Sequence, residues 1–332
     1  MALLSTQVAT LKDHAKRLDP DGKAAMIAEL LSQTNEILDD ALFMEGNLPT
    51  GHRTTVRTGL PQVFWRLLNQ GVQPSKSTTT QIDEGAGMLE AWSTVDVELA
   101  NLNGNTSAFR LSEAQAFLEA MNQEAAQTMF YGNSSIAQEE FNGLSVRYSS
   151  LAAANAQNII DAGGTGSDNS SIWLLSWGAQ TLCGIFPKGS KAGLSHEDMG
   201  IETVENTGGV VGSLMRAYRD CWKWKMGLAL KDWRYCVRIP NIDVSMLVAG
   251  TGADLTTFMI KAIHRLPNMN MGKPVFYMNR SVFQYLDIQR RTDVANGGQL
   301  DYSVIDGKAI HSFRGVPIKK CDALLETEAR VV

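Results

Sequence analysis

The fold is decided by residues 47–108, which read NLPTGHRTTVRTGLPQVFWRLLNQGVQPSKSTTTQIDEGAGMLEAWSTVDVELANLNGNTSA. Threonine and serine are frequent here, and the apolar residues come in short alternating bursts, as in Val95, Val97 and Leu99. Alternation with a period of two is typical of strands, so we expect an extended hairpin. An isolated two-stranded ribbon is marginally stable in water, and this segment has too few apolar residues to bury a core of its own. We therefore expect this arm to be ordered by lying on another copy of the chain, with more importance for assembly than for folding.

Length and charge set broad limits on the protein class. A chain of 332 residues can bury a substantial core and would divide into about two domains. Its contents of 44% hydrophobic and 20% charged residues are ordinary for a globular protein. Thirty basic residues minus 35 acidic residues give a net charge of -5. A protein that binds nucleic acid by neutralising phosphates normally has a basic face. This mild acidity therefore argues against a protein that recognises nucleic-acid sequence, but it is compatible with a shell that only encloses nucleic acid.

The cysteines and the apolar runs indicate the cellular compartment in which the chain folds. Cys183, Cys221, Cys236 and Cys321 lie far apart and form no CxxC pair, so we expect reduced core thiols in a cytoplasmic chain. A Cys221–Cys236 disulfide stays open as an alternative if their strands are neighbours. The first residues hold no apolar run long enough for a signal peptide. The longest apolar cluster, 172–179, is far shorter than the ~20 residues that span a bilayer, so we expect neither secretion nor a membrane.

Helical periodicity is strongest over residues 112–131. Ser112 and Gln115 have the spacing of a capping box, and Gly132 is expected to end the helix. Its predicted apolar face comprises Ala114, Phe117, Leu118, Met121, Ala125 and Met129. An earlier helix is expected from an N-cap at Asp21 to about Leu42. Two further helices are predicted over 253–265 and, capped by Asn279, over 280–290.

Strand-like segments dominate the second half of the chain. Strands are expected over 172–177, 182–186, 274–278, 308–313 and 316–320. Residues 214–232 are expected to form a hairpin that turns near Gly227, and 145–160 a strand leading into a helix. We find no internal repeat. The pattern predicts an α+β fold with an inserted arm.

Each sequence motif that could indicate a catalytic or binding site has a simpler structural explanation that fits better. The glycine pairs at 85/87, 164/166 and 250/252 lack both the third glycine of a dinucleotide motif and the GK[ST] ending of a phosphate loop, so turns are the better explanation. Asp161, Asp168 and Asn169 flank a glycine-rich turn, but not at calcium-loop spacing. His196 has no second histidine at HExxH spacing, and Ser190 is not in a GxSxG elbow. We predict no catalytic residue, cofactor or metal.

Several strings, taken in order along the chain, resemble the major capsid proteins of tailed bacteriophages, which share the Hong Kong 97-type fold. These strings are TGHRTTVR at 50–57, LNQGVQPSK at 68–76, IFPKGS at 185–190, PVFYMNR at 274–280 and FRGVPI at 313–318. None is a chemical motif, so the specificity of the resemblance comes from their number and order. The resemblance covers most of the chain.

The resemblance implies a domain organisation. Residues 1–46 would form an N-terminal arm with a helix, and 47–108 an extended β-hairpin loop. Residues 109–165 would hold a long spine helix (112–131) and peripheral-domain segments. Residues 166–332 would form an axial domain interleaved with returning peripheral-domain strands.

The resemblance also implies a structural function, with no enzymatic activity. Such proteins self-assemble as hexamers and pentamers into an icosahedral virion shell around double-stranded DNA, in the bacterial host cytoplasm. With no long scaffold-like N-terminal domain, a separate scaffolding protein is expected, together with a portal and, as an open alternative, a decoration or cement protein. Sequence-specific DNA binding is not expected. The candidate inter-subunit contacts are Arg53, Arg57, Phe64, Trp65, Arg66, Lys76 and Trp92.

Two other classes of protein compete with this interpretation. An open α/β enzyme would need a pocket with convergent titratable residues. A portal or tail component would instead form a ring of fixed symmetry. The size of the purified particle distinguishes the three hypotheses.

Overall fold

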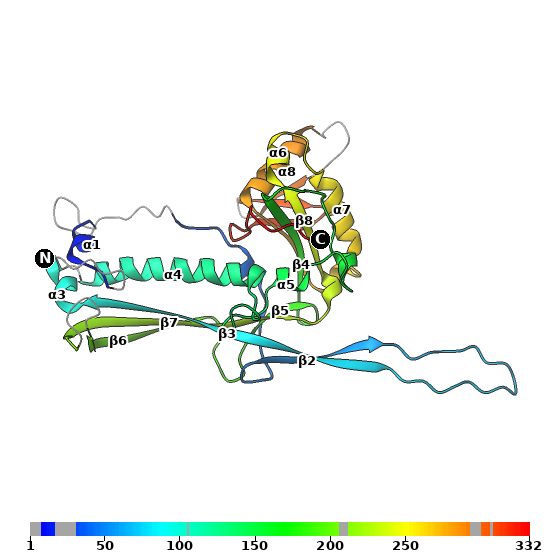
Figure 1. The fold of residues 1–332 in the computed structure, drawn as a ribbon, viewed down its shortest axis with the longest axis horizontal. Coiled ribbons are helices and arrows are strands. Elements are labelled where there is room, and N and C mark those ends of the chain that lie inside the picture. Colours follow the sequence, from blue (N-terminus) through cyan, green and yellow to red (C-terminus); the bar gives the residue numbers. More distant parts are fainter. Residues whose placement is uncertain (1–7, 17–30, 105, 206–211, 293–299, 306–307) are drawn as a thin grey trace. The chain divides into compact units, whose positions relative to one another are not determined.

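The computed structural model describes residues 8–16, 31–104, 106–205, 212–292, 300–305 and 308–332. The chain divides into two units. Unit 1 comprises residues 1–34, 88–126 and 193–225, and unit 2 comprises 35–87, 127–192 and 226–332. Three long elements continue from one unit into the other: β3 (Thr78–Asp96), α4 (Thr106–Tyr131) and β7 (Leu214–Leu230) (Figure 1).

Unit 1 joins the first part of α4 to a strand pair. β6 (Leu194–Glu205) runs antiparallel to β7 from Leu194↔Trp224 to Glu205↔Leu214, with a bulge beside Gly200. Phe117 of α4 stacks on Trp222 of β7 with ring centroids 5.2 Å apart. The described part of unit 1 also contains the helices α1 (Leu11–Lys16) and α3 (Val97–Ala100) and the 3₁₀ helix η1 (Leu102–Gly104).

Unit 2 is built on a mixed sheet. The strand order is β10 (Leu300–Ile305), β11 (Lys308–Phe313), β12 (Val316–Lys320), β9 (Lys273–Met278) and β4 (Asn169–Trp177), with β8 (Cys236–Asp243) also paired to β4. β4 meets β5 (Leu182–Phe186) in parallel at Trp177↔Leu182, and β5 also pairs with β1 (Phe43–Glu45). β9 and β12 are parallel, whereas β4 is antiparallel to β8 and β9.

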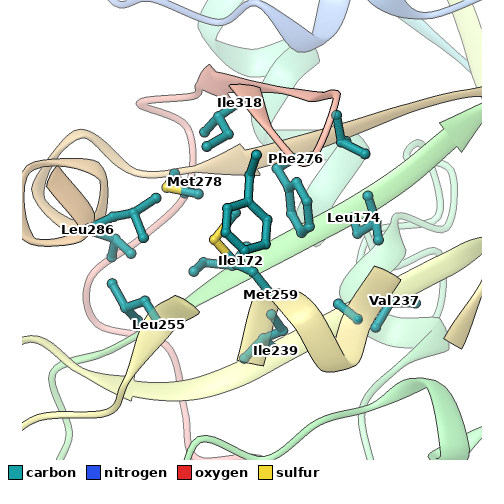
Figure 2. Packing of buried hydrophobic residues seen from close by; sticks show 14 of the residues in the cluster. Ile172, Leu174, Val237, Ile239, Leu255, Met259, Phe276, Met278, Leu286 and Ile318 are labelled. Carbon is teal, nitrogen blue, oxygen red and sulfur yellow. The ribbon is translucent and has the colours of Figure 1, made fainter. Parts of the chain in front are cut away.

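The main hydrophobic core lies between this sheet and two helices, α7 (Leu255–Arg265) and α8 (Arg280–Thr292) (Figure 2). The sheet contributes alternate residues of its strands, because side chains two apart point to the same face. The labelled members in Figure 2 are Ile172, Leu174, Val237, Ile239, Leu255, Met259, Phe276, Met278, Leu286 and Ile318. Asp254 caps α7 by accepting from the backbone N–H of Thr257, and Asn279 accepts from Ser281 at the start of α8.

The opposite face of β4 packs against aromatic residues of the chain preceding it. Trp173 is fully buried and meets Tyr148 edge-on at 5.9 Å and Phe130 at 6.2 Å. Edge-on and tilted pairs at this separation are favoured by the ring quadrupoles. The short elements of unit 2 are α2 (Ile37–Asp40), α5 (Leu144–Arg147), η2 (Ala156–Asn158), η3 (Trp233–Tyr235), α6 (Val244–Val248) and η4 (Met269–Met271).

A long hairpin projects from unit 2. β2 (Gly51–Gly59) is antiparallel to β3 from Gly51↔Gly85 to Gly59↔Thr78, with a bulge near Arg57 (Figure 1). Residues 60–77 connect the two strands without regular structure. The prediction of an extended hairpin is therefore confirmed.

Many predicted elements are confirmed. Strands occupy 172–177, 182–186, 274–278, 308–313 and 316–320, and helices begin near 253 and at 280. The long helix ends at Tyr131, directly before Gly132, as expected. The prediction of core thiols is also confirmed, since all four cysteines are buried and free.

Several expectations about local structure are wrong. The long helix begins at Thr106, so Ser112 lies inside it and its hydroxyl donates to the Phe109 carbonyl at 3.0 Å instead of capping. Val97 and Leu99 belong to the helix α3, which Asp96 caps. Residues 214–230 form one continuous strand without a turn at Gly227. In place of a strand and helix over 145–160 there are only turns, the end of α5 and η2.

The early helix expected from Asp21 is also wrong where the structure describes it. Residues 31–36 are not helical, Leu31 is exposed, and only Ile37–Asp40 form a short helix. The start of that expected helix, including Asp21, lies outside the described residues. The polar face of α4 instead holds this part of the chain: Glu119 accepts from the Gln33 N–H at 2.8 Å, and Gln123 donates to the Leu31 carbonyl at 2.6 Å.

Candidate assembly surface

The connection between β2 and β3, which we call the hairpin tip (residues 60–77), exposes an unusual density of apolar side chains. Val63 is 88%, Trp65 104% and Leu68 90% exposed. Leu60, Phe64, Leu67 and Val72 are also exposed. A contiguous apolar patch on a soluble protein marks an interaction surface far more often than scattered single residues do.

Few hydrogen bonds shape the tip. The Ser75 hydroxyl donates to the Gln62 carbonyl at 2.7 Å, and the Gln70 N–H donates to the Leu67 carbonyl at 3.2 Å. Asn69 has a positive φ of 67°, which the asparagine side chain tolerates better than most. These contacts give the tip a local turn but leave its apolar side chains on the surface.

The predicted contact residues fall into three groups. Phe64, Trp65, Arg66 and Lys76 all lie in the tip and are exposed. Arg57 lies on β2 opposite Thr79, where the strands begin to separate. The remaining two, Arg53 and Trp92, make contacts within their own chain.

Arg53 forms a two-pronged ion pair across the hairpin. Its Nε donates to Asp83 Oδ1 at 2.5 Å and its Nη2 to Asp83 Oδ2 at 2.6 Å. The hydrogen bond from Arg53 lowers the pKa of Asp83. Because both side chains are exposed, this pair contributes to hairpin register more than to stability.

Trp92 belongs to unit 1, and two cationic side chains lie against its indole ring. The Arg219 guanidinium lies 4.4 Å from its ring centroid, and Lys223 Nζ lies 5.7 Å away. The indole Nε1 donates to Glu90 Oε1 at 2.5 Å. A partly exposed Trp fixed by a stacked Arg is the kind of side chain that dominates interface energetics.

The base of the hairpin is anchored by a buried ion pair. The Arg147 guanidinium binds both oxygens of Glu84, with Nη2 to Oε2 at 2.7 Å and Nη1 on Oε1. Arg147 Nη2 also donates to the carbonyls of Asn142 at 3.0 Å and Leu228 at 3.2 Å. One side chain therefore ties β3 to α5, to the turn before it and to β7. Glu84 and Arg147 are 63 residues apart, and sequence reasoning missed both.

Glycines let the backbones meet closely at this base. A Cβ on Gly227 would lie 2.6 Å from the Gly85 carbonyl oxygen, and one on Gly51 would lie 2.0 Å from that of Glu84. Real Cβ atoms do not approach so closely, so both positions require glycine. Gly227 is thus a contact glycine in a continuous strand, which explains why it does not mark a turn.

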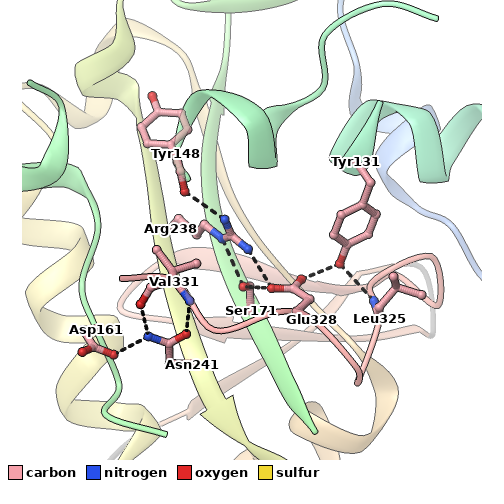
Figure 3. Close-up of polar contacts among 9 residues, drawn as sticks. All are labelled: Tyr131, Tyr148, Asp161, Ser171, Arg238, Asn241, Leu325, Glu328 and Val331. Atoms are coloured by element: carbon pink, nitrogen blue, oxygen red, sulfur yellow. Dashed lines mark hydrogen bonds and ion pairs between the residues drawn. The ribbon is translucent and has the colours of Figure 1, made fainter. Parts of the chain in front are cut away.

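A second polar network, in unit 2, fastens the last residues of the chain (Figure 3). Glu328 accepts from Arg238 Nη2 at 2.7 Å and from the hydroxyls of Ser171 and Tyr131. Asn241 pairs with the backbone of Val331 through both its amide atoms, at 2.8 and 2.9 Å. Burial together with the Glu328 carboxylate raises the pKa of Tyr131. Each of these partners donates to the carboxylate, so the network stabilises the subunit by holding its C-terminal segment in place.

The residues considered for chemistry all have local structural partners. His196 Nε2 lies 3.0 Å from Asp220 Oδ1, and the Ser190 hydroxyl donates to the Pro187 carbonyl at 2.6 Å. Asp168 accepts from Ser245, and these hydrogen bonds lower the pKa of Asp168. Within the part of the chain that the structure describes, no three His, Cys, Asp or Glu residues converge as a metal site would require. No described helix has the length and hydrophobicity to cross a membrane.

Comparison with known proteins decides the family. The family model "Major capsid protein GP7" matches residues 19–332. The chain belongs to this family. A chain from the structure of bacteriophage epsilon15 is 35% identical, with coverage of 100% of this chain and 99% of that one and a TM-score of 0.78. This major capsid protein therefore has the α+β fold of the Hong Kong 97 type, is a structural, self-assembling protein and is located in the virion capsid.

More distant structures also match. The bacteriophage JBD30 capsid shares 9% identity over 89% of this capsid protein and 93% of that chain, with a TM-score of 0.46. An encapsulin complex from Synechococcus elongatus shares 10% identity over 66% and 91%, with a TM-score of 0.43. No curated protein matches the chain.

Proposed function

We propose that this capsid protein assembles as hexamers and pentamers into an icosahedral shell that encloses packaged double-stranded DNA. The observation that carries the proposal is the exposed hairpin tip, with Trp65 and Leu68 wholly or almost wholly in solvent. Apolar area buried on association contributes roughly 25 cal/mol per Å². A tip that stays exposed in the free subunit gains this contribution only by contact with a partner.

We further propose that the expected domain organisation holds: an N-terminal arm at 1–46, an extended loop at 47–108, and peripheral and axial segments over 109–165 and 166–332. The tip residues Phe64, Trp65, Arg66 and Lys76 would be inter-subunit contacts, as would Arg57. Arg53 and Trp92 remain in the proposal, each through a side chain already oriented by its own chain.

The partners follow from this role. We propose assembly in the host cytoplasm with a separate scaffolding protein and a portal, and DNA held without sequence-specific contacts. Binding of a decoration protein to the finished shell stays open as an alternative. The protein would act by contact alone, without catalysing a reaction.

The experiment replaces only the tip. Replacing residues 60–77 with a two-residue Asn-Gly turn should leave a soluble, folded subunit and abolish closed particles, assessed by thermal unfolding and by electron microscopy. Excision of the whole segment from Arg53 to Glu98 is unsuitable, because it would also remove Glu84 and Val95, which are buried. Removal of the tip alone tests our expectation that the arm matters more for assembly than for folding. Closed particles formed by the tip-deleted chain would refute the proposal.

A further inference from the structure

A glycine-rich loop in unit 2 gathers side-chain oxygen atoms at the end of the β4–β8 pair. Residues 161–169 read DAGGTGSDN and lead directly into β4. Asn169, the first residue of β4, lies opposite Asp243, the last residue of β8. Directly opposed residues of an antiparallel pair have neighbouring side chains on one face of the sheet. Together with Asp168, which precedes β4, these residues form what we call the oxygen cluster: Asp168, Asn169 and Asp243.

The two carboxylates of the oxygen cluster are oriented by the start of α6. Asp168 Oδ2 accepts from the Ser245 N–H at 2.9 Å. Asp243 Oδ1 accepts from the Ser245 hydroxyl at 2.8 Å and from the Met246 N–H at 2.9 Å. These bonds leave the second oxygen of each carboxylate, Asp168 Oδ1 and Asp243 Oδ2, for another ligand.

The second oxygens converge on Gly166. A Cβ on Gly166 would lie 2.6 Å from Asp168 Oδ1 and 2.9 Å from Asp243 Oδ2, so both oxygens lie on the same side of this glycine. Asp243 is only 8% exposed. Residues 148–187 and 239–260 contain no Lys, Arg or His, so the segments around the cluster supply no positive charge of their own. Two carboxylates in one buried place favour the binding of a cation, because like charges repel one another.

The amide of Asn169 points to a ligand independently of the carboxylates. Asn169 is fully buried, and its Nδ2 donates to the Gly166 carbonyl at 2.6 Å, but its Oδ1 accepts no hydrogen bond from the described residues. A Cβ on Gly164 would lie 2.8 Å from this Oδ1 and 3.0 Å from Asp243 Cβ, so the amide oxygen faces the same loop beside Asp243. Buried acceptors are paired in the great majority of cases. An unpaired one next to two carboxylates therefore indicates an acceptor set suited to a cation.

We propose that Asp168, Asn169 and Asp243 bind a divalent cation, with calcium preferred over magnesium. Calcium accepts carboxylate, amide and water oxygens in flexible geometry, whereas magnesium requires near-ideal octahedral geometry and gives up its water reluctantly. Two carboxylates and one amide, completed by water, make a weak site with a dissociation constant on the order of 10⁻⁴ to 10⁻³ M. The ligands come from two strand ends instead of one continuous loop, which is why the sequence spacing does not match a calcium loop.

The site would stabilise more than its own loop. The Glu328 N–H donates to the Asn169 carbonyl at 2.9 Å. Asn241, two residues before Asp243, donates to Asp161 at 2.8 Å and is bonded to Val331 (Figure 3). A bound cation would thus strengthen the place where the C-terminal segment is held. The oxygen cluster lies wholly within unit 2, so this inference is independent of the proposed shell function.

Calcium titration of the purified full-length subunit tests the site. We expect isothermal titration calorimetry with CaCl₂ to show one saturable site. Saturating CaCl₂ should also raise the thermal unfolding midpoint by about 3 °C above its value in chelator, because the ligand binds the folded chain. MgCl₂ at the same concentration should have a smaller effect, and NaCl of equal ionic strength none. No saturable calcium binding would overturn the proposal, and equal effects of calcium and magnesium would overturn the calcium preference.

Charge removal locates the binding. Asp168→Asn and Asp243→Asn each keep an oxygen that can accept from the start of α6 but lose the negative charge. We expect each to weaken calcium binding by at least about tenfold. Asp254→Asn is the matched control, because Asp254 caps α7 in a similar way away from the oxygen cluster, and its calcium affinity should stay at the wild-type value. Unchanged affinity in both cluster variants, or an equal loss in the control, would refute the assignment.

A glycine substitution provides a second test should either Asn variant fail to fold. Gly166→Ala places a methyl group against both free carboxylate oxygens and should push them apart. We expect this variant to lose the calcium response while circular dichroism shows a folded subunit. Gly71→Ala, in the hairpin tip, has open space around its new methyl group and should respond to calcium as the wild type does. Wild-type calcium affinity in folded Gly166→Ala would contradict the proposal.

Discussion

Arg147 and Glu84 form a buried, two-pronged ion pair at the base of the hairpin, with Nη2 and Oε2 2.7 Å apart. Arg147 uses its remaining donors on three backbone carbonyls, those of Asn142, Gly143 and Leu228. A buried charge pair persists only when its other hydrogen-bonding groups are also satisfied, as they are here. The arm thus extends from a rigid base, although its tip has no partner in the described chain other than its own turn contacts.

Breaking this pair should destabilise the subunit. Arg147→Met leaves the Glu84 carboxylate buried without its partner, which should lower the free energy of unfolding by about 3 kcal/mol. Urea unfolding of the isolated subunit measures this. Arg53→Ala, which removes the exposed pair on the same hairpin, is the control and should cause no measurable change. Equal effects of the two substitutions would show that the base is not the anchor.

Local sequence patterns predicted the buried strands well, because a run such as 172–177 is apolar on both faces of a covered sheet. They failed where a residue's role depends on distant contacts. Gly227 suggested a turn, yet it is glycine because the Gly85 carbonyl approaches it. Ser112 and Gln115 match a capping box inside a helix that Thr106 already begins.

The candidate surface was predictable only in part. The arm could be found because its strand-like segment has too few apolar residues to bury a core of its own and so needs another copy to lie on. The Arg147–Glu84 anchor could not be predicted, because it joins two segments that lie 63 residues apart and no local pattern encodes their proximity. Trp92 stays a predicted inter-subunit contact, and its stacking on Arg219 within the chain could not be foreseen, because that contact depends on the register of the strands.

Phe117 should be critical for folding of unit 1. Phe117→Asp replaces the ring stacked on Trp222 with a carboxylate facing an apolar partner, at a cost of several kcal/mol, roughly. We expect insoluble protein, measured as the soluble fraction after expression. Ala116→Asp, one residue earlier on an exposed position, is the control and should remain soluble. An insoluble control would show that the helix tolerates no acidic residue here, whatever the face.

Glu119→Ala should loosen the segment that precedes α2. The Glu119 carboxylate accepts from the Gln33 N–H and from Gln123. Removing it should cost about 1 kcal/mol and increase proteolysis near residue 33. Limited proteolysis with mass spectrometry measures this, with Gln115→Ala, at an exposed position of the same helix, as the comparison. Identical cleavage patterns for both variants would show that the bond does not hold the N-terminal segment.

Stability should fall at alkaline pH. Burial raises the pKa of Cys236 and of Cys321 from 9.0 to about 12. Below pH 9 both the folded and the unfolded chain keep these protons, so the contribution of the two thiols to the free energy of unfolding is fully present. Between about pH 9 and 12 the unfolded chain releases them while the folded chain does not, so the free energy of unfolding decreases.

The Cys321→Ala variant isolates this effect. Its urea midpoint should fall less steeply than that of the wild type above about pH 9, because one of the two thiols is gone. Val275→Ala, a buried substitution without a titrating group, should shift the curve downwards and keep the wild-type slope. A wild-type slope in Cys321→Ala would assign the alkaline loss to other groups.

Free subunits should bind DNA weakly. With a net charge of -5, few phosphates can be neutralised, so affinity should be low, independent of sequence and strongly reduced by salt. Fluorescence anisotropy with two unrelated duplexes at low and physiological salt measures this. Tight binding that persists at high salt would indicate a nucleic-acid-binding role for the subunit.

The central claim is that copies of this chain close into a shell. Electron microscopy of the chain expressed with the proposed scaffolding protein tests it most directly, through the symmetry of the particles. We predict closed icosahedral particles with fivefold vertices joined by sixfold capsomers. Rings of one fixed symmetry, or only small soluble oligomers under conditions where the scaffold is present and folded, would contradict it.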